Sequence, residues 1–183
     1  MGGNHSQLTE EELEDYKELT YLTRKEIFHT FKVFTNLDPA GVKKDKYIRI
    51  PAETILNLPE FKNNPFADRL CKVFSSQDDD KLSFEDFLDM ISVLSDDAHP
   101  RKKAEYAFRV YDFDEDGYLS REDIETLVNK LTNTKMNERE INSLIDSILE
   151  VADLDKDGML SFQEFEHVVT KSMDFKNSFH LRL

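Results

Sequence analysis

Apolar residues recur along this chain at intervals of three and four, the period of a helix that buries one face. The pattern is clearest in three stretches, formed by Phe84, Phe87, Leu88, Ile91 and Leu94, by Ile124, Leu127, Val128 and Leu131, and by Phe162, Phe165, Val168 and Val169. Each stretch follows a serine that stands three residues before an acid, as Ser83 stands before Asp86. This is the spacing of a capping box, which marks a helix N-terminus. The pattern therefore predicts three helices with defined starts.

Two further stretches of helical period end just before acidic segments. They comprise Tyr106, Phe108, Val110 and Tyr111, and Ile141, Leu144, Ile145, Ile148 and Leu149. The segments that follow are DFDEDGYLSRED at 112–123 (the third loop) and DLDKDGMLSFQE at 153–164 (the fourth loop), with acids, glycine and serine in the same order. A weaker copy, SSQDDDKLSFED, lies at 75–86 (the second loop). Such a repeat indicates one structural unit, helix, loop and helix, used several times.

The first third of the chain follows this pattern less closely. Capping boxes at Thr9 and Thr23, each with a glutamate three residues later, predict two helices, the second with an apolar stripe. A first loop would cover residues 36–54, which exceed the repeat length, lack its acid spacing and contain three lysines, so we expect it to bind no cation. Pro51, Pro59 and Pro65 predict short, interrupted helices before the second loop.

The third and fourth loops place oxygen atoms where a calcium loop needs them. Ca²⁺ takes roughly six to eight oxygen ligands, and the twelve-residue EF-hand loop supplies them from positions 1, 3, 5, 7, 9 and 12. These positions hold Asp112, Asp114, Asp116, Tyr118 (through its carbonyl), Ser120 and Asp123 in the third loop, and Asp153, Asp155, Asp157, Met159 (through its carbonyl), Ser161 and Glu164 in the fourth. We predict that both loops bind Ca²⁺. The second loop has Ser75, Gln77 and Asp80 at positions 1, 3 and 6, so we expect it to be structural and empty.

These features together predict an all-α fold of four EF-hand units in two paired lobes. Position 6 requires a positive φ, which favours glycine, and Gly117 and Gly158 occupy it. Leu119 and Leu160 at position 8 should face each other in a short β pairing between the loops. The expected parts are an N-terminal arm with an extra helix (1–22), a cation-inactive pair (23–95), a cation-binding pair (96–171) and a C-terminal extension (172–183).

The acid at position 12 differs between the two cation loops. Glu164 is long enough to offer two oxygens, whereas Asp123 is one methylene shorter and should reach a cation with one oxygen or through water. Mg²⁺ prefers octahedral six-coordination. We therefore expect Mg²⁺ to be well tolerated in the third loop and Ca²⁺ to be preferred in the fourth.

Composition narrows the classes of partner. Lys and Arg total 24 against 38 Asp and Glu, and the formal charge of -14 makes a nucleic-acid partner improbable. Cys71 is the one cysteine, which precludes an internal disulfide and suits a reducing compartment. No apolar run approaches the roughly 20 residues that span a bilayer. We expect a cytoplasmic protein that associates with the plasma membrane only peripherally.

The chain resembles the calcium- and integrin-binding protein family of the EF-hand superfamily over nearly its whole length. The resemblance is carried by DYKELTYLTRKEI, LPEFKNNPFADRLCKVFS, LSFEDFLDMISVLSD, YAFRVYDFDEDGYLSRED and MDFKNSFHLRL. It implies four EF-hands, of which the first two are inactive and the third ends in aspartate. It also implies a non-enzymatic, cation-dependent adaptor for helical cytoplasmic segments of membrane proteins. The implied partner classes are integrin α-subunit tails and transmembrane channel-like mechanotransduction proteins.

The N-terminus matches a lipidation pattern. Met1-Gly2 followed by Ser6 fits N-myristoylation of Gly2, and the resemblance supports that reading. A single myristoyl chain binds membranes only marginally, with a constant of about 10⁴ M⁻¹. Six acids between residues 10 and 18 oppose binding to an anionic surface. The second anchor should therefore be a membrane-protein partner.

A partner helix would bind an apolar groove in the C-terminal pair, as in EF-hand sensors. Groove candidates are Leu127, Leu131, Ile141, Leu144, Ile148, Phe162, Phe165 and Val169, and we place Leu131, Leu144, Ile145, Ile148 and Val169 nearest the partner. The same residues must partly serve as core. The extension is too apolar for a free tail, and its Phe175 and Phe179 either pack permanently on the C-terminal lobe or plug the groove until a target displaces them, the arrangement that the resemblance favours.

No catalytic constellation emerges, since the chain has no phosphate-cradling glycine loop and no nucleophile motif, and the cation loops account for the acids. Two alternatives to the adaptor stay open: a passive Ca²⁺ buffer and a calcineurin-B-like regulatory subunit of an enzyme. A buffer would expose no apolar surface on binding Ca²⁺, and a regulatory subunit would co-purify with phosphatase or kinase activity.

Overall fold

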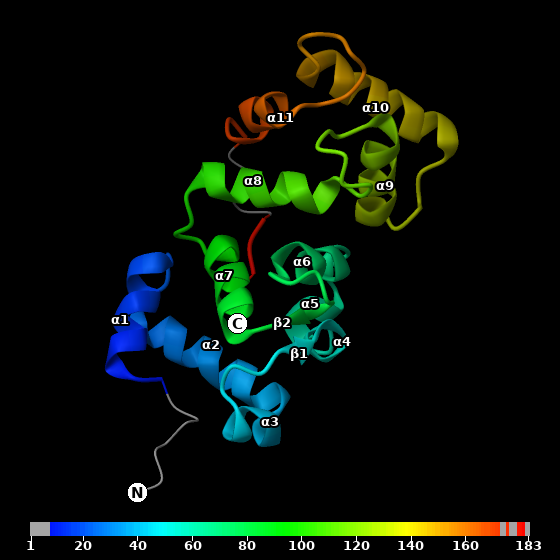
Figure 1. Ribbon diagram of the computed structural model, residues 1–183. Coiled ribbons are helices and arrows are strands. Elements are labelled where there is room, and N and C mark those ends of the chain that lie inside the picture. The colour runs from blue at the N-terminus through cyan, green and yellow to red at the C-terminus, as the bar shows by residue number, and fades with distance from the viewer. Residues whose placement is uncertain (1–7, 173–174, 176–178, 182–183) are drawn as a thin grey trace, which may run out of the picture. The chain divides into compact units, whose positions relative to one another are not determined.

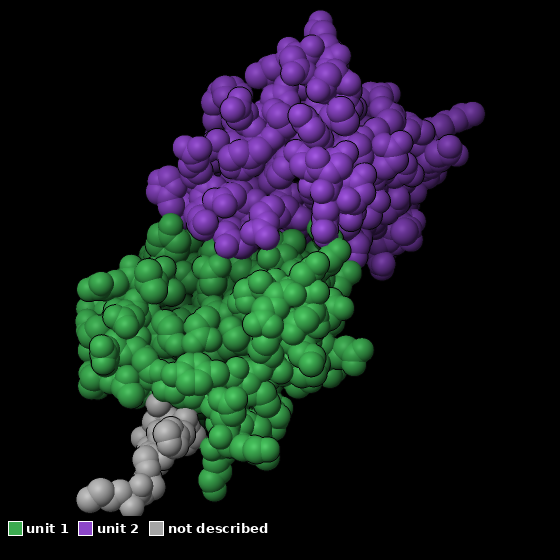
Figure 2. Space-filling model, viewed as in Figure 1, with its two compact units in different colours: residues 1–98, 180–183 green, residues 99–179 purple. Residues whose placement is uncertain are grey.

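The computed structural model describes residues 8–172, 175 and 179–181. The chain divides into two compact units (Figure 2): unit 1 is Met1–Ala98 with His180–Leu183, and unit 2 is His99–Phe179. Both units are helical (Figure 1), which confirms the all-α fold. No helix in the described part of the chain has both the length and the apolar character needed to cross a membrane.

Unit 1 contains the extra N-terminal helix and the first two helix–loop–helix units. Its elements are α1 (Glu10–Leu19), α2 (Arg24–Leu37), α3 (Pro39–Lys44), β1 (Ile50–Pro51), α4 (Ala52–Ile55), α5 (Pro59–Lys62), α6 (Ala67–Phe74), β2 (Lys81–Leu82) and α7 (Phe84–Leu94). The predicted capping boxes at Thr9 and Thr23 are both present. The short helices α4 and α5 confirm the interruptions expected from the prolines.

The core of unit 1 surrounds α7, which packs against α2 and α6. Nine of its eleven residues are buried, and a helix that is apolar on most sides occupies the centre of a domain. Phe84 meets Phe31 edge to face at 5.0 Å between ring centroids, and Phe34 lies 5.7 Å from Phe87. This packing fixes the helix on which the second loop ends.

The first loop differs from expectation, because α3 forms within residues 36–54. Asp38 caps this helix by accepting a hydrogen bond from the Gly41 N–H at 2.9 Å, and Pro39 supplies a helical φ at the first position. The chain then runs on to β1, which pairs antiparallel with β2 so that Ile50 lies opposite Leu82. This pairing places the end of the first loop beside the second loop.

Unit 2 consists of two helix–loop–helix units. These are α8 (Pro100–Tyr111) with α9 (Arg121–Thr132), and α10 (Glu138–Ala152) with α11 (Phe162–Val169). Phe108 of α8 contacts Phe162 and Phe165 of α11, each at 5.6 Å between centroids. Leu119 and Leu160 exchange two backbone hydrogen bonds of 2.9 Å, which confirms the predicted pairing of the third and fourth loops.

Candidate metal centres and partner surface

The third loop gathers three carboxylates from its first half. Ligand atoms of Asp112, Asp114 and Asp116 all lie within 4.8 Å of one another. The loop starts where α8 ends, and Asp112 is buried there while the other two acids are exposed. The N–H groups of Asp116 and Gly117 donate to the Asp112 carboxylate at 3.2 and 3.0 Å, which fixes the turn.

These carboxylates create a local excess of negative charge. Burial raises the pKa of Asp112, although the backbone N–H groups that it accepts act in the opposite direction, and the neighbouring charge of Asp123 raises it further. A bound dication would relieve both the desolvation and the repulsion. The donor set, consisting of hard oxygens, fits Ca²⁺ or Mg²⁺.

The fourth loop repeats this arrangement with a different set of acids. Ligand atoms of Asp153, Asp155 and Glu164 lie within 4.8 Å of one another. The Asp157 N–H donates to Asp155 at 3.2 Å and acts to lower the pKa of Asp155. Burial and three nearby carboxylates outweigh that bond, so the pKa is raised. This site is also charged in a way that a dication would neutralise.

Asp123 and Glu164, the acids at position 12, accept similar backbone hydrogen bonds but differ in how close they lie to the other acids of their loops. Asp123 accepts from the N–H groups of Phe113 and Ser120, each at 2.9 Å. Glu164 accepts from the N–H of Leu154 at 2.7 Å and from that of Ser161 at 2.9 Å. Among the described residues, the group of close ligand atoms includes the position-12 acid in the fourth loop, whereas the group in the third loop consists of positions 1, 3 and 5.

The remaining predicted donors lie in the same two loops. Ser120 and Ser161 each cap the following helix, and their hydroxyls donate to the position-12 acid at 2.7 Å. Asp116 and Asp157 accept the N–H groups of Tyr118 and Met159, each at 2.9 Å. Those bonds orient the backbone at position 7, where a carbonyl ligand is expected.

The residues predicted to contact a partner differ in their exposure to solvent. Ile145 is fully buried and is a core residue, so the expectation that its side chain faces a partner does not hold in this conformation. Leu131 and Leu144 are exposed by 62% and 38%, and Ile148 and Val169 are half-buried. Val151, which the sequence pattern did not single out, is 70% exposed. Its spacing from Leu144 and Ile148 continues one apolar stripe along α10.

The C-terminal extension packs in unit 2 through its aromatic rings. Phe175 stacks on Phe179 at 6.0 Å and meets Phe165 of α11 edge to face at 6.3 Å. Phe179 is buried, and the ammonium of the fully buried Lys103 donates to its carbonyl at 2.7 Å. These contacts hold the extension against α8 and α11.

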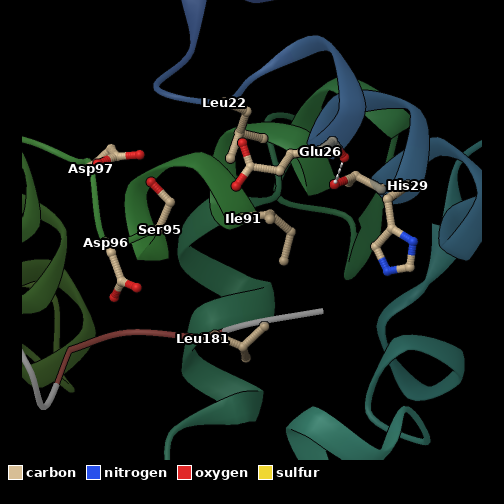
Figure 3. Close-up of a pocket in the computed structure, with 9 residues that line it drawn as sticks. Leu22, Glu26, His29, Ile91, Ser95, Asp96, Asp97 and Leu181 are labelled. Atoms are coloured by element: carbon tan, nitrogen blue, oxygen red, sulfur yellow. Dashed lines mark hydrogen bonds between the residues drawn. The ribbon is translucent and has the colours of Figure 1, made fainter.

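The end of the chain belongs to unit 1. The Leu181 N–H donates to the Leu94 carbonyl at 3.0 Å. Leu181 also lines a pocket of about 250 Å³ together with Leu22, His29 and Ile91 (Figure 3). Gly2, the predicted acylation site, lies outside the described residues.

Sequence reasoning also missed Arg49, whose guanidinium lies in the second loop. The signal available was a lone arginine immediately before the short strand that pairs with that loop. Arg49 follows Lys43, Lys44 and Lys46 in a basic segment, and a single arginine there forms no motif that the sequence alone would reveal.

Comparison with known proteins places these loops in a family. A family model for an EF-hand domain pair matches residues 101–170. Calcium and integrin-binding family member 2 of Danio rerio is 40% identical over the whole of both chains, and that of Homo sapiens is 37% identical over the whole of both. Calcium and integrin-binding family member 3 of Homo sapiens is 38% identical, again over full length. The chain belongs to the calcium and integrin-binding family.

Membership of the calcium and integrin-binding family confirms the resemblance found in the sequence. The relatives are named as binding proteins, which agrees with a role other than catalysis. The matched EF-hand pair covers both acid groups, so family and geometry point to Ca²⁺ binding in the same part of the chain.

Proposed function

We propose that this protein is a cation-dependent adaptor that binds Ca²⁺ in the third and fourth loops and, in that state, binds an amphipathic helix of a membrane protein. The observation that carries the proposal is the pair of acid groups, each with ligand atoms within 4.8 Å, in two loops joined by the Leu119–Leu160 bridge. Asp112, Asp114 and Asp116 would hold an ion in the third loop. Asp153, Asp155 and Glu164 would hold one in the fourth, with the other predicted oxygens completing each shell.

The two sites should act together. The Leu119–Leu160 bridge links the loops through two backbone hydrogen bonds, so a change of one loop is transmitted to the other. Each loop is continuous with helices at both ends, and in EF-hand sensors ordering of the loops changes the angle between those helices. Mg²⁺ is the second proposed ion, and the third loop suits it because its acid group lacks the long position-12 glutamate.

The partner surface would be the apolar stripe on α10, formed by Leu144, Ile148 and Val151, with Leu131 of α9. A shallow hollow of about 480 Å³ beside it is lined by Leu144, Ser143 and Arg139. An amphipathic helix presents apolar side chains at a matching spacing of three, four and seven residues. The relatives' names include integrin binding, which makes an integrin α tail the first partner class to test, with a transmembrane channel-like protein second.

Association with the plasma membrane is the last part of the proposal. Myristoylation of Gly2 would supply a weak anchor, and the membrane-protein partner would supply the other. Mass spectrometry of the protein made in a eukaryotic cell tests the acylation. A protein whose mass shows no myristoyl group would restrict attachment to the partner.

A peptide-binding titration tests the adaptor. An integrin α-tail peptide and a transmembrane channel-like peptide are titrated calorimetrically in Ca²⁺, in Mg²⁺ and in chelator. We expect binding in Ca²⁺ that weakens by at least about tenfold in chelator. Leu144→Asp should abolish it, whereas Leu19→Asp, which changes a leucine of unit 1 that is even more exposed (80% against 38%), should not.

Two results would overturn the proposal: equal peptide affinity with and without ions, or no uptake of Ca²⁺ by the protein. A hydrophobic dye distinguishes the adaptor from a passive buffer, because only the adaptor should bind more dye in Ca²⁺ than in chelator. Co-purification with phosphatase or kinase activity would instead indicate a regulatory subunit of an enzyme.

A further inference from the structure

The second loop keeps the backbone of a cation loop although its residues have changed. In the third loop the left-handed positions 4 and 6 are Glu115 (φ 62°) and Gly117 (φ 89°). In the second loop the same positions are Asp78 (φ 49°) and Asp80 (φ 54°), neither of them a glycine. Two non-glycine residues in this region, two positions apart, carry backbone strain, which persists only where the surroundings hold the loop.

Other features of a filled loop are retained as well. Asp79 at position 5 accepts the Lys81 N–H at 3.1 Å, as Asp116 accepts the Tyr118 N–H in the third loop. Asp86 at position 12 closes a capping box with Ser83. The oxygens of positions 1, 5, 7 and 12 are therefore arranged around the loop's interior.

The guanidinium of Arg49 occupies this interior. Its Nη2 donates to Asp79 Oδ1 at 2.8 Å, to the Lys81 carbonyl at 2.7 Å and to the Ser75 hydroxyl at 3.3 Å. Its Nη1 donates to Asp86 Oδ2 at 2.9 Å and to the Ser76 hydroxyl at 3.1 Å, and its Nε donates to Asp79 Oδ2 at 3.2 Å. Positions 1, 5, 7 and 12 of the loop thus all bind one cationic group.

We propose that Arg49 is the built-in cation of the second loop. It stands where the third and fourth loops would bind a dication, and it keeps the N-terminal EF-hand pair in an ordered conformation at any Ca²⁺ concentration. The first loop places Arg49 there, because Arg49 directly precedes β1, whose Ile50 pairs with Leu82 at position 8 of the second loop. The proposal concerns unit 1 alone and does not depend on ion binding in unit 2.

Removal of Arg49 should turn the loop into a weak cation site. The side chains of Arg49 and Asp86 are only 15% and 8% exposed, and that of Asp79 is 35% exposed, so loss of the guanidinium leaves two neighbouring carboxylates without their shared cation. Two serine hydroxyls and the Lys81 carbonyl remain beside them. The six oxygens that Arg49 contacts, three of them from two carboxylates, suit Ca²⁺, with a dissociation constant on the order of 10⁻⁴–10⁻³ M, the weak end of such sites.

Amide hydrogen exchange of the full-length protein, read residue by residue by NMR, tests this. In chelator, Arg49→Met should speed exchange at residues 75–86 by about tenfold or more, and millimolar Ca²⁺ should slow it again. The wild-type loop should exchange at the same slow rate with and without Ca²⁺. Lys44→Met, which removes an exposed charge from the same segment, should leave the second loop unchanged.

If Arg49→Met does not fold in chelator, Arg49→Gln carries the test, because its neutral amide keeps part of the hydrogen bonding. Restoration of protection by Ca²⁺ in either variant supports the proposal. Exchange in the second loop that is unaltered in chelator, or that does not respond to millimolar Ca²⁺ in a folded variant, would overturn it. Arg49 would then be an ordinary ion-pairing residue.

Discussion

A single methylene separates the acids that close the third and fourth loops, and it gives a prediction about selectivity. Glu164 lies within the group of ligand atoms of its loop, whereas Asp123 does not join the corresponding group. We predict that Asp123→Glu adds a carboxylate oxygen to the third site. Its preference for Ca²⁺ over Mg²⁺ should rise on the order of tenfold, because Mg²⁺ keeps six-coordinate geometry. Calorimetric titration with each ion measures the ratio.

The reciprocal variant is the control for that experiment. Glu164→Asp should shift the fourth site toward Mg²⁺ while the third site keeps its selectivity. Unchanged selectivity in both variants would contradict the prediction that the length of the acid at position 12 sets the preference between Ca²⁺ and Mg²⁺.

The Asp79 carboxyl gives a prediction about pH. The hydrogen bond from Arg49 is the main cause that lowers the pKa of Asp79 from 3.8 to about 2. Because the folded pKa lies below the unfolded one, this pair stabilises the protein above the unfolded pKa, and the stabilisation is lost as the pH falls toward 2. In Arg49→Met, an NMR titration of the carboxyl should show the pKa of Asp79 back near its ordinary value. A pKa that stays near 2 in that variant would contradict this assignment.

The sequence predicts the individual metal ligands better than it predicts their surroundings. Acid spacing identified the loop acids because each ligand position lies within twelve residues of the others. Arg49 lies 26 residues before Ser75, and only the β1–β2 pairing brings the two together. Ile145 shares its helical period with Leu144 and Ile148, and periodicity alone does not separate a core position from a partner-facing one.

At the scale of the elements, the second, third and fourth loops have the same backbone conformation, with a positive φ at positions 4 and 6. This shared conformation gives a prediction about the glycine at position 6. Gly158 has φ 87°, and a Cβ added there would meet nothing within 4 Å, so substitution changes only the backbone energy. We predict that Gly158→Ala costs about 1–2 kcal/mol and lowers the Ca²⁺ affinity of the fourth loop by roughly tenfold. Calorimetry and thermal unfolding in Ca²⁺ measure both effects.

Asparagine provides the comparison, because Asn and Asp tolerate the left-handed region better than alanine. The second loop already places Asp80 at position 6 with φ 54°. Gly158→Asn should therefore lose less affinity than Gly158→Ala. Equal losses would indicate that the conformation at position 6 does not control the site.

The helices were predictable where a cap and an apolar stripe coincide. The capping boxes at Ser83, Ser120 and Ser161 start α7, α9 and α11 at the predicted residues. The short helix α3 was not predictable from an apolar period, because one turn contains only Val42 as a buried residue. Its start depends on Asp38 and Pro39, signals that are equally typical of a turn.

In the molecule as a whole, the two units differ in the cation that the acids of their loops are proposed to bind. Unit 1 contains a loop whose interior holds the side chain of Arg49, and unit 2 contains two loops whose grouped acids fit a dication. On the proposals above, ions change the conformation of unit 2 while unit 1 stays constant. If the C-terminal extension occupies the groove reversibly, it would then decide whether the surface of unit 2 is free for a partner.

The extension gives the last prediction. The buried Lys103 ammonium donates to the Phe179 carbonyl, so Lys103→Met keeps the side-chain length but removes a hydrogen bond with a net value of about 1.5–3 kcal/mol. If the extension competes with a target helix, this variant should bind an integrin α-tail peptide up to about tenfold more tightly. Deletion of residues 172–183 should do the same, and Lys102→Met, a half-exposed neighbour paired with Glu105, should not. Calorimetry in Ca²⁺ measures all three. Affinity that is unchanged or weaker in both the Lys103 variant and the deletion, with the helical content intact, would show that the extension is a permanent part of unit 2.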